Sequence, residues 1–298
     1  MVDPAEVCVV VPTLDEAETV GDVVEGFHEA GYGNVLVVDG GSTDGTRGIA
    51  REAGARVERQ SRSGKGQAVR EAMTHVETPY VLLVDGDGTY RPADADAMLA
   101  PLDEGADHVV GDRFADMRPG AMSRLNRVGN WLINRTFRAV HGEDYGDVLS
   151  GYRAFTRESF GRMTLSSDGF GIETEMAVEC AKRGIRTAVV PITYLPRPSG
   201  SDTNLRPVRD GGIIFLELYR RAKTNNPLFY FGSLGVLSTI TGLVIAVYVA
   251  VEWITVNVSH EVLAVVSGFG IIVGVQLLMF GVLADLILTL HRDTLQKI

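Results

Sequence analysis

The sequence predicts an α/β protein with a mostly parallel, doubly wound sheet, followed by two long apolar helices. Three observations point to this fold class. Short β-branched runs alternate with helix-length segments, polar clusters follow the ends of three such runs, and two 23-residue stretches near the end carry no charge. Alternation of this kind produces βαβ units, in which helices connect and cover parallel strands.

The first strands are apolar runs that suit burial on both faces of a parallel sheet, and we expect them at 6–11, 34–38, 55–59 and 80–84. Helices are expected between them at 16–30, 46–53 and 66–76. Ligands bind at the carboxyl ends of the strands in such sheets. The active site is therefore expected at the polar clusters that follow three strands, at 13–16, 39–46 and 85–90.

The composition excludes some partners. A formal net charge of −10 argues against a nucleic-acid-binding protein, which needs clustered basic residues. Only 4 of the 28 basic residues are lysines. An acidic, lysine-poor surface is typical of proteins from a high-salt cytoplasm, although GC-rich codon usage would leave a similar bias. Cys8 and Cys180 are far apart and have no paired spacing, so we expect core residues, not a disulfide or metal site.

The two uncharged stretches, 229–251 and 262–284, are each long enough to cross a hydrocarbon core of roughly 30 Å. Buried helices of a soluble domain are the alternative, which two such runs in tandem disfavour. Gly270 and Gly274 have the spacing of small residues that seat one membrane helix against another. We therefore expect a transmembrane hairpin, with helices at about 229–251 and 262–290.

The charges around the hairpin predict its orientation. The linker between the stretches holds Glu252 and Glu261 and no Lys or Arg, whereas the flanks carry Arg206, Arg209, Arg220, Arg221, Lys223, Arg292 and Lys297. By the positive-inside rule, both flanks face the cytoplasm. We expect a cytoplasmic catalytic domain at 1–205, an amphipathic interfacial segment at 206–227, and a hairpin at 228–298 in the cell membrane with a short cytoplasmic C-terminus.

Asp85-Gly86-Asp87 is the sharpest chemical signal. Two carboxylates one residue apart at a strand end can bind one hard cation, and Gly86 permits close approach. Mg²⁺ or Mn²⁺ is held in this way by one or two carboxylates, with the diphosphate of a nucleotide and water completing its shell. The cation would offset charge on a departing nucleoside diphosphate. The alternative is a solvated turn.

Asp39 and Lys65 are further candidates. Asp39 ends the second strand, where a carboxylate can accept hydrogen bonds from a base or ribose. Its alternative role is to cap the helix that begins near Thr46, a position that Ser42 and Asp44 suit better. Lys65 lies between Gly64 and Gly66 and can bring an ammonium group to a phosphate, but the full P-loop pattern is missing.

Several ordered sequence blocks resemble the family 2 glycosyltransferases of the GT-A fold, and more closely the dolichol-phosphate mannose or glucose synthase branch. The matching blocks are 12–16, 38–46, 65–68, 85–87, 111–113, 147–153, 169–175 and 190–197. The resemblance implies a nucleotide-sugar donor, UDP-glucose being favoured over GDP-mannose or UDP-N-acetylglucosamine. It also implies a divalent cation and, as acceptor, dolichyl or another polyprenyl phosphate in the bilayer. The implied relatives are archaeal enzymes that make lipid-phosphate-linked sugars for protein N-glycosylation or cell-surface glycans.

The resemblance also implies roles for particular residues. The nucleotide pocket would be lined by Pro12, Asp15, Glu16 and Asp39, and Asp85 and Asp87 would bind the metal, with Gly86 contacting the donor through its backbone. Arg113 and Arg197 would hold phosphate groups, and Arg124 is a further candidate for the acceptor phosphate. Asp147 lies where other branches keep a catalytic base; here it is expected either to act as one or to orient Arg153 or the acceptor. A helix N-cap or loop carboxylate is the alternative role.

This chain departs from the family pattern at a few positions. Leu14 replaces a frequent aromatic residue, and Thr89 stands where relatives place a Gln that can complete the metal shell. The first block ends in Asp-Glu where Asn-Glu is usual, and a family Lys beyond Arg197 is missing. These departures concern the identity of the sugar and nucleotide.

Two alternatives to transfer onto a lipid phosphate remain. A phosphate monoester is already anionic at neutral pH, so its attack on the sugar, with inversion, needs no strong base. A hydroxyl acceptor, on a polysaccharide or glycolipid, would need one, and Asp147 would be that base. A membrane scaffold with a degenerate transferase domain is the non-enzymatic alternative, which the intact pair of Asp85 and Asp87 disfavours.

Overall fold

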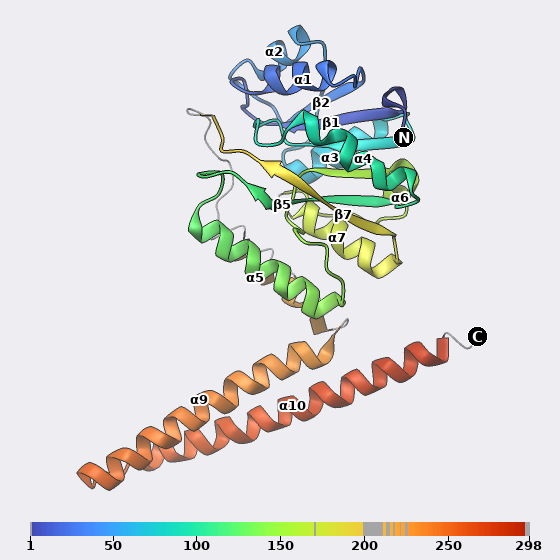
Figure 1. Cartoon of the computed structure of the whole chain (residues 1–298). Coiled ribbons are helices and arrows are strands. Elements are labelled where there is room, and N and C mark those ends of the chain that lie inside the picture. The colour runs from blue at the N-terminus through green and yellow to red at the C-terminus, as the bar shows by residue number, and fades with distance from the viewer. Residues whose placement is uncertain are drawn as a thin grey trace. The chain divides into compact units, whose positions relative to one another are not determined.

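The structure is a computed structural model (Figure 1). It describes residues 2–169, 171–198, 211–212, 215–216, 218–220, 222–223 and 226–295. Contacts divide the chain into two compact units, Met1–Arg138 with Glu143–Ile214, and Ala139–Gly142 with Phe215–Ile298. The predicted boundary near residue 205 stays a prediction.

A mixed sheet forms the centre of the first unit. Within the described residues it has seven strands in the order β3-β2-β1-β4-β6-β5-β7. Their bounds are β1 Val7–Thr13, β2 Val35–Asp39, β3 Arg56–Arg59, β4 Tyr80–Leu83, β5 His108–Met117, β6 Arg153–Thr156 and β7 Thr187–Tyr194. Only β6 is antiparallel to its neighbours, β4 and β5, whereas the other pairings are parallel. The expectation of a mostly parallel sheet is confirmed.

Helices cover both faces of this sheet (Figure 1). They are α1 Val20–Glu29, α2 Thr46–Glu52, α3 Lys65–His75, α4 Ala95–Asp103, α5 Arg124–His141, α6 Arg157–Gly161 and α7 Ile172–Arg183, with 3-10 turns η1 Pro4–Glu6 and η2 Pro92–Asp94. Alternate β1 residues enter opposite cores: Val9 packs in one with side chains of α1 and α4, and Val10 in the other with side chains of α3 and α7. Both faces of the central strands are thus buried, as their continuous apolar runs predict.

Two elements differ from their predicted bounds. β1 continues through Pro12 to Thr13, beyond the expected stop. Its pairing with β4 ends at Val10 and Leu83, so β4 needs no N–H from Pro12. α1 begins at Val20, four residues later than expected, because the preceding residues form a loop that bonds to the loop after β2 and to the first residue of α2.

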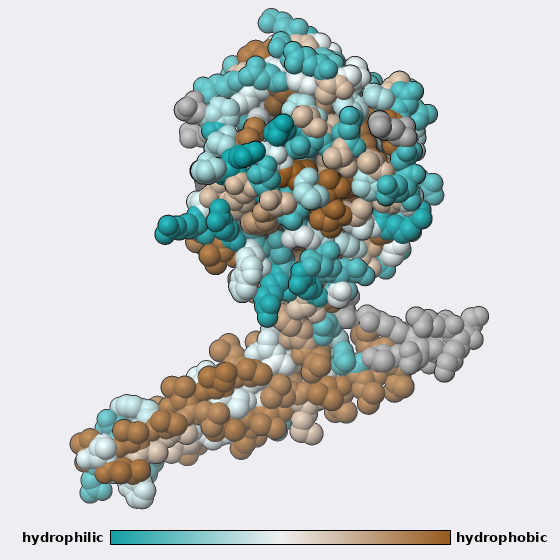
Figure 2. All heavy atoms as spheres, in the orientation of Figure 1, coloured by the Kyte–Doolittle hydropathy of each residue, from teal (hydrophilic) through white to brown (hydrophobic). Residues whose placement is uncertain are grey.

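The second unit contains the two apolar helices, α9 Pro227–Val256 and α10 Glu261–Leu295. Both are long and apolar enough to cross a membrane. Only 11% of the most apolar stretch of each is buried, unlike the core helix of a soluble domain. Figure 2 shows the resulting hydrophobic surface along the hairpin. The predicted two-helix hairpin is therefore present.

Glycines bring α9 and α10 into close contact. A Cβ atom at Gly235 would lie 2.7 Å from the carbonyl oxygen of Gly274, and Gly270 approaches Gly242. The Ser238 hydroxyl donates to the carbonyl of Gly270 at 2.8 Å. Gly270 and Gly274 thus lie between the helices as predicted, and their partners Gly235 and Gly242 complete a small-residue seam.

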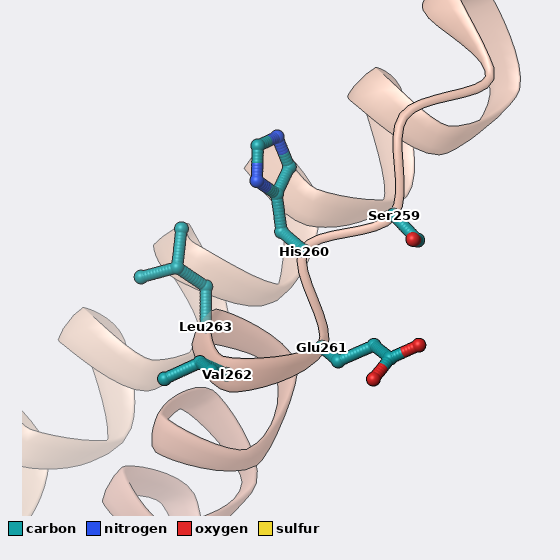
Figure 3. Close-up of a pocket in the computed structure, with 5 residues that line it drawn as sticks. All are labelled: Ser259, His260, Glu261, Val262 and Leu263. Atoms are coloured by element: carbon teal, nitrogen blue, oxygen red, sulfur yellow. The ribbon is translucent and has the colours of Figure 1, made fainter.

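The turn of the hairpin bears a small pocket of about 320 Å³, which Figure 3 shows with its lining residues Ser259, His260, Glu261, Val262 and Leu263. None of the predicted site residues lies there. Part of the predicted interfacial segment 206–227 falls outside the described residues. Those that the structure describes between 211 and 223 are helical.

Candidate active site

The carboxyl ends of β2, β1 and β4 lie at one edge of the sheet, because these three strands are parallel neighbours. The loop after β1 is bonded there to the loop after β2. The backbone N–H of Asp15 donates to the Ser42 hydroxyl at 2.8 Å, and the Asp15 carboxylate accepts from the backbone of Thr43 at 2.8 Å. Asp15 adopts a left-handed backbone conformation, with φ of 54°. These bonds hold the first two predicted polar clusters together.

Asp39 is fully buried at the end of β2. Its carboxylate accepts from the backbone N–H groups of Gly41 at 3.0 Å and Ser42 at 3.1 Å, and it pairs with the Arg47 guanidinium at 3.4 Å. Asp39 therefore shapes the turn that precedes α2, whose N-cap residue is Gly45. The structure places Asp39 at the predicted edge, with its carboxylate already bonded to this turn.

The third cluster packs against the end of β1. A Cβ atom at Gly86 would lie 2.7 Å from the Thr13 side chain, so a glycine is needed there to let the two loops approach. The Thr19 hydroxyl donates to the carbonyl of Gly86 at 2.7 Å. The contacts thus extend across all three loops at this edge.

Lys65 lies between two carboxylates at this edge. Its ammonium group forms ion pairs with Asp85 and with Glu173, and its side chain is only 12% exposed. Burial alone would lower the pKa of Lys65, but the charges of Asp85 and Glu173 outweigh it and hold that pKa above its ordinary value. The ammonium is therefore charged and already in contact with the first residue of the predicted metal pair.

The flanking glycines explain how Lys65 reaches this position. A Cβ atom at Gly64 would overlap the backbone of Asp168, and one at Gly66 would overlap the backbone of Ser167. The backbone N–H of Gly66 donates to the carbonyl of Asp168 at 3.0 Å. The loop before α7 thereby packs on the start of α3 and brings Glu173 close to Lys65.

Asp87 is bonded to a threonine and an arginine. Its carboxylate accepts from the Thr89 hydroxyl at 2.6 Å and pairs with the Arg197 guanidinium at 2.7 Å. Arg197 also lies 3.6 Å from Glu16. Thr89, at the position where a metal-binding Gln was expected, thus orients Asp87. Asp87 and Glu16 meet Arg197 although they lie far from it in the sequence.

Arg113 and Asp147 form a second, buried centre. The guanidinium binds both carboxylate oxygens, at 2.5 and 2.9 Å, donates to the Asn130 side chain at 3.0 Å, and lies over the Tyr194 ring. Burial would lower the pKa of Arg113, but Asp147 outweighs it and raises that pKa. Bidentate pairs of this kind are among the strongest hydrogen-bonded ion pairs.

One of the sequence-based expectations was that Asp147 orients Arg153. The contacts of Arg153 differ from that expectation. Arg153 is fully buried and donates to the carbonyls of Ser150 at 3.0 Å and Val148 at 2.8 Å. Burial lowers the pKa of its guanidinium. Arg153 therefore fixes the backbone after Asp147, while the carboxylate turns to Arg113.

Two predicted residues lie differently from the rest. Pro12 is buried inside β1, paired with Val38, and so contributes backbone near the edge. Arg124 is exposed at the start of α5, and no described contact joins it to the other predicted site residues.

Sequence reasoning assigned no role to Glu173, Asn130 or Tyr90. Glu173 lies in a matching block and is an acidic residue in the first turn of a largely buried helix, which was the available signal. Tyr90 is buried, its hydroxyl accepts from the backbone of Gly151 at 3.0 Å, and burial raises its pKa. Asn130 carries no comparable signal in the sequence.

The donor set fits a divalent cation of the Mg²⁺ class. Asp85 and Asp87 follow one strand, and among the described residues no group of three or more His, Cys, Asp or Glu side chains surrounds a common point. A cation here would have at most this carboxylate pair from the protein, with phosphate and water oxygens completing its shell. Lys65 and Arg197 neutralise the same carboxylates in the structure.

Comparison with known proteins agrees with this architecture. Residues 8–163 match the model of the family "Glycosyl transferase family 2". The chain is 69% identical over 299 residues to "Glycosyltransferase AglJ" of Haloferax volcanii, covering 100% of this chain and 99% of that protein. It is 34% identical over 213 residues to "Dolichyl-phosphate hexose transferase" of the same organism, covering 70% of this chain and 90% of that protein.

A solved structure shares the fold. Glucosyl-3-phosphoglycerate synthase from Mycobacterium tuberculosis, in complex with Mn²⁺, UDP-glucose and phosphoglyceric acid, aligns with a TM-score of 0.59 and 23% identity, covering 73% of this chain and 79% of that one. The sheet, its covering helices and these matches define a GT-A glycosyltransferase. The chain belongs to glycosyltransferase family 2.

Proposed function

We propose that this enzyme transfers a hexose from a nucleotide sugar to dolichyl or another polyprenyl phosphate, with inversion at the anomeric carbon. UDP-glucose is the favoured donor, with GDP-mannose and UDP-N-acetylglucosamine as the other candidates. The product is a lipid-phosphate-linked sugar for protein N-glycosylation or cell-surface glycans. The names of the two Haloferax relatives and the apolar hairpin support this proposal.

The contacts of Asp147 are the observation that favours a phosphate over a hydroxyl group as the acceptor. Both of its oxygens are bound by Arg113, and the residue is fully buried. Both oxygens are engaged by the guanidinium, so a base at this position would first have to leave Arg113 before it could meet an acceptor hydroxyl. A hydroxyl acceptor needs a base, whereas a phosphate monoester arrives already ionised. The geometry therefore favours a phosphate acceptor.

The proposed reaction needs no protein base. An oxygen of the lipid phosphate attacks the anomeric carbon as the bond from that carbon to the nucleoside diphosphate breaks, and the electron pair leaves with the diphosphate. Two anions must be brought together for this step, so positioning and charge neutralisation are the main requirements. Attack in line with the leaving group converts an α-linked donor into a β-linked product.

The cations of the site suit this task. Lys65 and Arg197 neutralise Asp85 and Asp87 in the structure, and both cations would be available for phosphate oxygens if these two carboxylates held a divalent cation. Such a cation, Mg²⁺ or Mn²⁺, would supply charge neutralisation at the donor diphosphate. The Arg113 guanidinium, by contrast, is already paired with Asp147 and bonded to Asn130, so its charge is balanced in the structure.

The acceptor also explains the hairpin. A polyprenyl chain stays in the bilayer, so an enzyme that uses its phosphate must work at the membrane surface. Two helices long enough to span the hydrocarbon core provide that anchor. By the charge asymmetry of its flanks, the catalytic unit faces the cytoplasm.

The test compares acceptors that differ only in the phosphate. Membranes containing the protein are incubated with radiolabelled UDP-glucose, GDP-mannose or UDP-N-acetylglucosamine, and with either dolichyl phosphate or dolichol. We expect label in the lipid fraction with one donor and dolichyl phosphate alone. Label in dolichol would instead establish the hydroxyl-acceptor alternative, and no label in any lipid would refute the proposal.

A further inference from the structure

Lys65 has two carboxylate partners of different character. One is Asp85, a member of the predicted metal pair, whose side chain is 26% exposed. The other is Glu173 in the first turn of α7, whose side chain is only 4% exposed. The ammonium group is therefore shared between a carboxylate that a ligand can reach and one that is buried. If Asp85 bound another cation, Lys65 would still keep Glu173 as its counter-ion.

Contacts between α3 and α7 hold Lys65 and Glu173 in place. α3 begins at Lys65 and packs with α7 on the same face of the sheet. The loop before α7 is bonded to α3 through the backbone N–H of Gly66, and to α7 through the Glu175 carboxylate, which accepts from the backbone of Ser167 at 2.8 Å. A change of partners at this site is therefore left to the Lys65 side chain, whose four-carbon stem is flexible.

The Lys65 ammonium competes for the position that a divalent cation would take. It already binds the Asp85 carboxylate, and its positive charge would repel a second cation at the same oxygens. Glu173 draws on the same ammonium charge and so weakens its hold on Asp85. The balance between these two carboxylates therefore sets how easily a cation can displace Lys65.

Arg197 repeats the arrangement on the other member of the pair. Its guanidinium lies 2.7 Å from Asp87 and 3.6 Å from Glu16, whose side chain is 11% exposed. Both carboxylates of the predicted metal pair are thus bound to a basic side chain that has a second acidic partner close by. Two such arrangements at one site point to an exchange of counter-ions when ligands bind.

We propose that Lys65 is an internal competitor for the cation site, and that Glu173 is a positioning residue that weakens this competition. Without a nucleotide, Lys65 holds Asp85 and keeps the affinity for a divalent cation low. A nucleoside diphosphate offers Lys65 phosphate oxygens in place of Asp85, so nucleotide and cation favour each other's binding. The inference rests on the cation of the proposed function, and not on the sugar or the lipid acceptor.

Mn²⁺ binding to the purified full chain in detergent measures this competition without sugar transfer. Free Mn²⁺ is quantified by electron paramagnetic resonance, first without nucleotide and then with UDP or GDP. Without nucleotide, we expect Lys65→Met to bind Mn²⁺ about tenfold more tightly than wild type, because the competing charge is gone. Lys182→Met, exposed on α7, is the matched control and should bind as wild type does.

Glu173→Gln should act in the opposite direction. It leaves the Lys65 charge to Asp85 alone, so Mn²⁺ should bind about threefold to tenfold more weakly, whereas Glu52→Gln, exposed on α2, should have no effect. Lys65→Met should therefore tighten Mn²⁺ binding more in the Glu173→Gln background than in wild type. UDP or GDP should raise the affinity for Mn²⁺ less in Lys65→Met than in wild type.

Three outcomes would overturn the inference. Mn²⁺ affinity at or below that of wild type in folded Lys65→Met, or in Lys65→Gln if the first variant does not fold, would show that Lys65 is no competitor. Equal weakening by Glu173→Gln with and without Lys65 would show that Glu173 does not act through Lys65. Absence of Mn²⁺ binding to wild type even with UDP or GDP would also reject the cation of the proposed function, which the first two outcomes leave intact.

Discussion

The two halves of the sheet hold their charges in different ways. In the half formed by β3, β2, β1 and β4, Asp85 is 26% exposed and Asp87 pairs with Arg197, which is 29% exposed. In the half formed by β6, β5 and β7, the Asp147 side chain is fully buried and Arg113 is 10% exposed. The Lys65–Asp85 and Asp87–Arg197 pairs thus each have one partner that is partly exposed, whereas both partners of the Arg113–Asp147 pair are buried.

This difference separates two tasks. An ion pair with a partly exposed partner is screened by solvent and can exchange that partner, as a site must when a cation and a diphosphate arrive. A buried bidentate pair is strongly disturbed when one partner is lost. We therefore expect changes in the first half to affect turnover more than folding, and changes in the second half to affect both.

The largest expected effect is on turnover after Asp87→Asn. The substitution removes a charge from the predicted metal pair but keeps the size and a hydrogen-bonding oxygen for Thr89. Loss of one group that stabilises developing charge costs on the order of 10²–10³-fold in rate. Sugar transfer is measured against wild type, with Asp22→Asn on the exposed face of α1 as the control. Activity equal to wild type would exclude Asp87 from the metal site.

The next effect is on stability after Asp147→Asn. Arg113 would keep its charge in a buried position without a counter-ion, which costs about 3–5 kcal/mol in comparable buried pairs. Denaturant unfolding of the purified protein in detergent measures the loss, and Asp87→Asn serves as the comparison from the other half. Equal losses in the free energy of unfolding of the two variants would contradict the proposed difference between the halves.

A smaller effect is expected at the junction of the halves, where Gly151 lies against Asp85. A Cβ atom there would overlap the Asp85 carboxylate. Gly151→Ala should shift that carboxylate and slow turnover about 10–100-fold, with little change in unfolding. Gly33→Ala, where nothing lies within 4 Å, is the matched control. Equal rates for the two variants would show that the position of Asp85 is not critical.

The smallest effect concerns pH. His108 is buried beside Arg153, and burial followed by the charge of Arg153 lowers its pKa well below 6.5. Below about pH 6.5, His108 therefore binds a proton in the unfolded chain but not in the folded protein. Its contribution to the free energy of unfolding is fully present above about pH 6.5 and is lost as the pH drops below that value. His108→Gln, which keeps an acceptor for Arg153, should flatten the melting temperature between neutral and acidic pH. An unchanged slope would assign the dependence to other groups.

The sequence predicts the first half of the sheet well because its signals are local. The apolar runs that become β1, β2 and β4 have polar clusters at their carboxyl ends, and parallel topology alone brings Asp39 and Asp85 to one edge. The hairpin is likewise predicted by length and absence of charge.

Long-range pairings could not be predicted in the same way. Arg197 meets Asp87, and Lys65 meets Glu173, through a fold that brings distant loops together, and no local pattern specifies which carboxylate takes which cation. Asp147 was expected to act as a base or to orient Arg153, because the sequence does not show that Arg113 is closer. The apolar residues of α5 have helical spacing, but only the structure shows that Leu125 and Val128 are uncovered while Ile133 is buried.

The chemical structure of the lipid product tests the central claim most directly. Purified protein is incubated with dolichyl phosphate, a divalent cation and each nucleotide sugar, and the extracted lipid is analysed by mass spectrometry and NMR. We predict a dolichyl phosphate that has gained one sugar through a β-linked phosphodiester and has kept its single phosphate. A sugar joined to a hydroxyl group, or no modified lipid with any donor, would contradict the account.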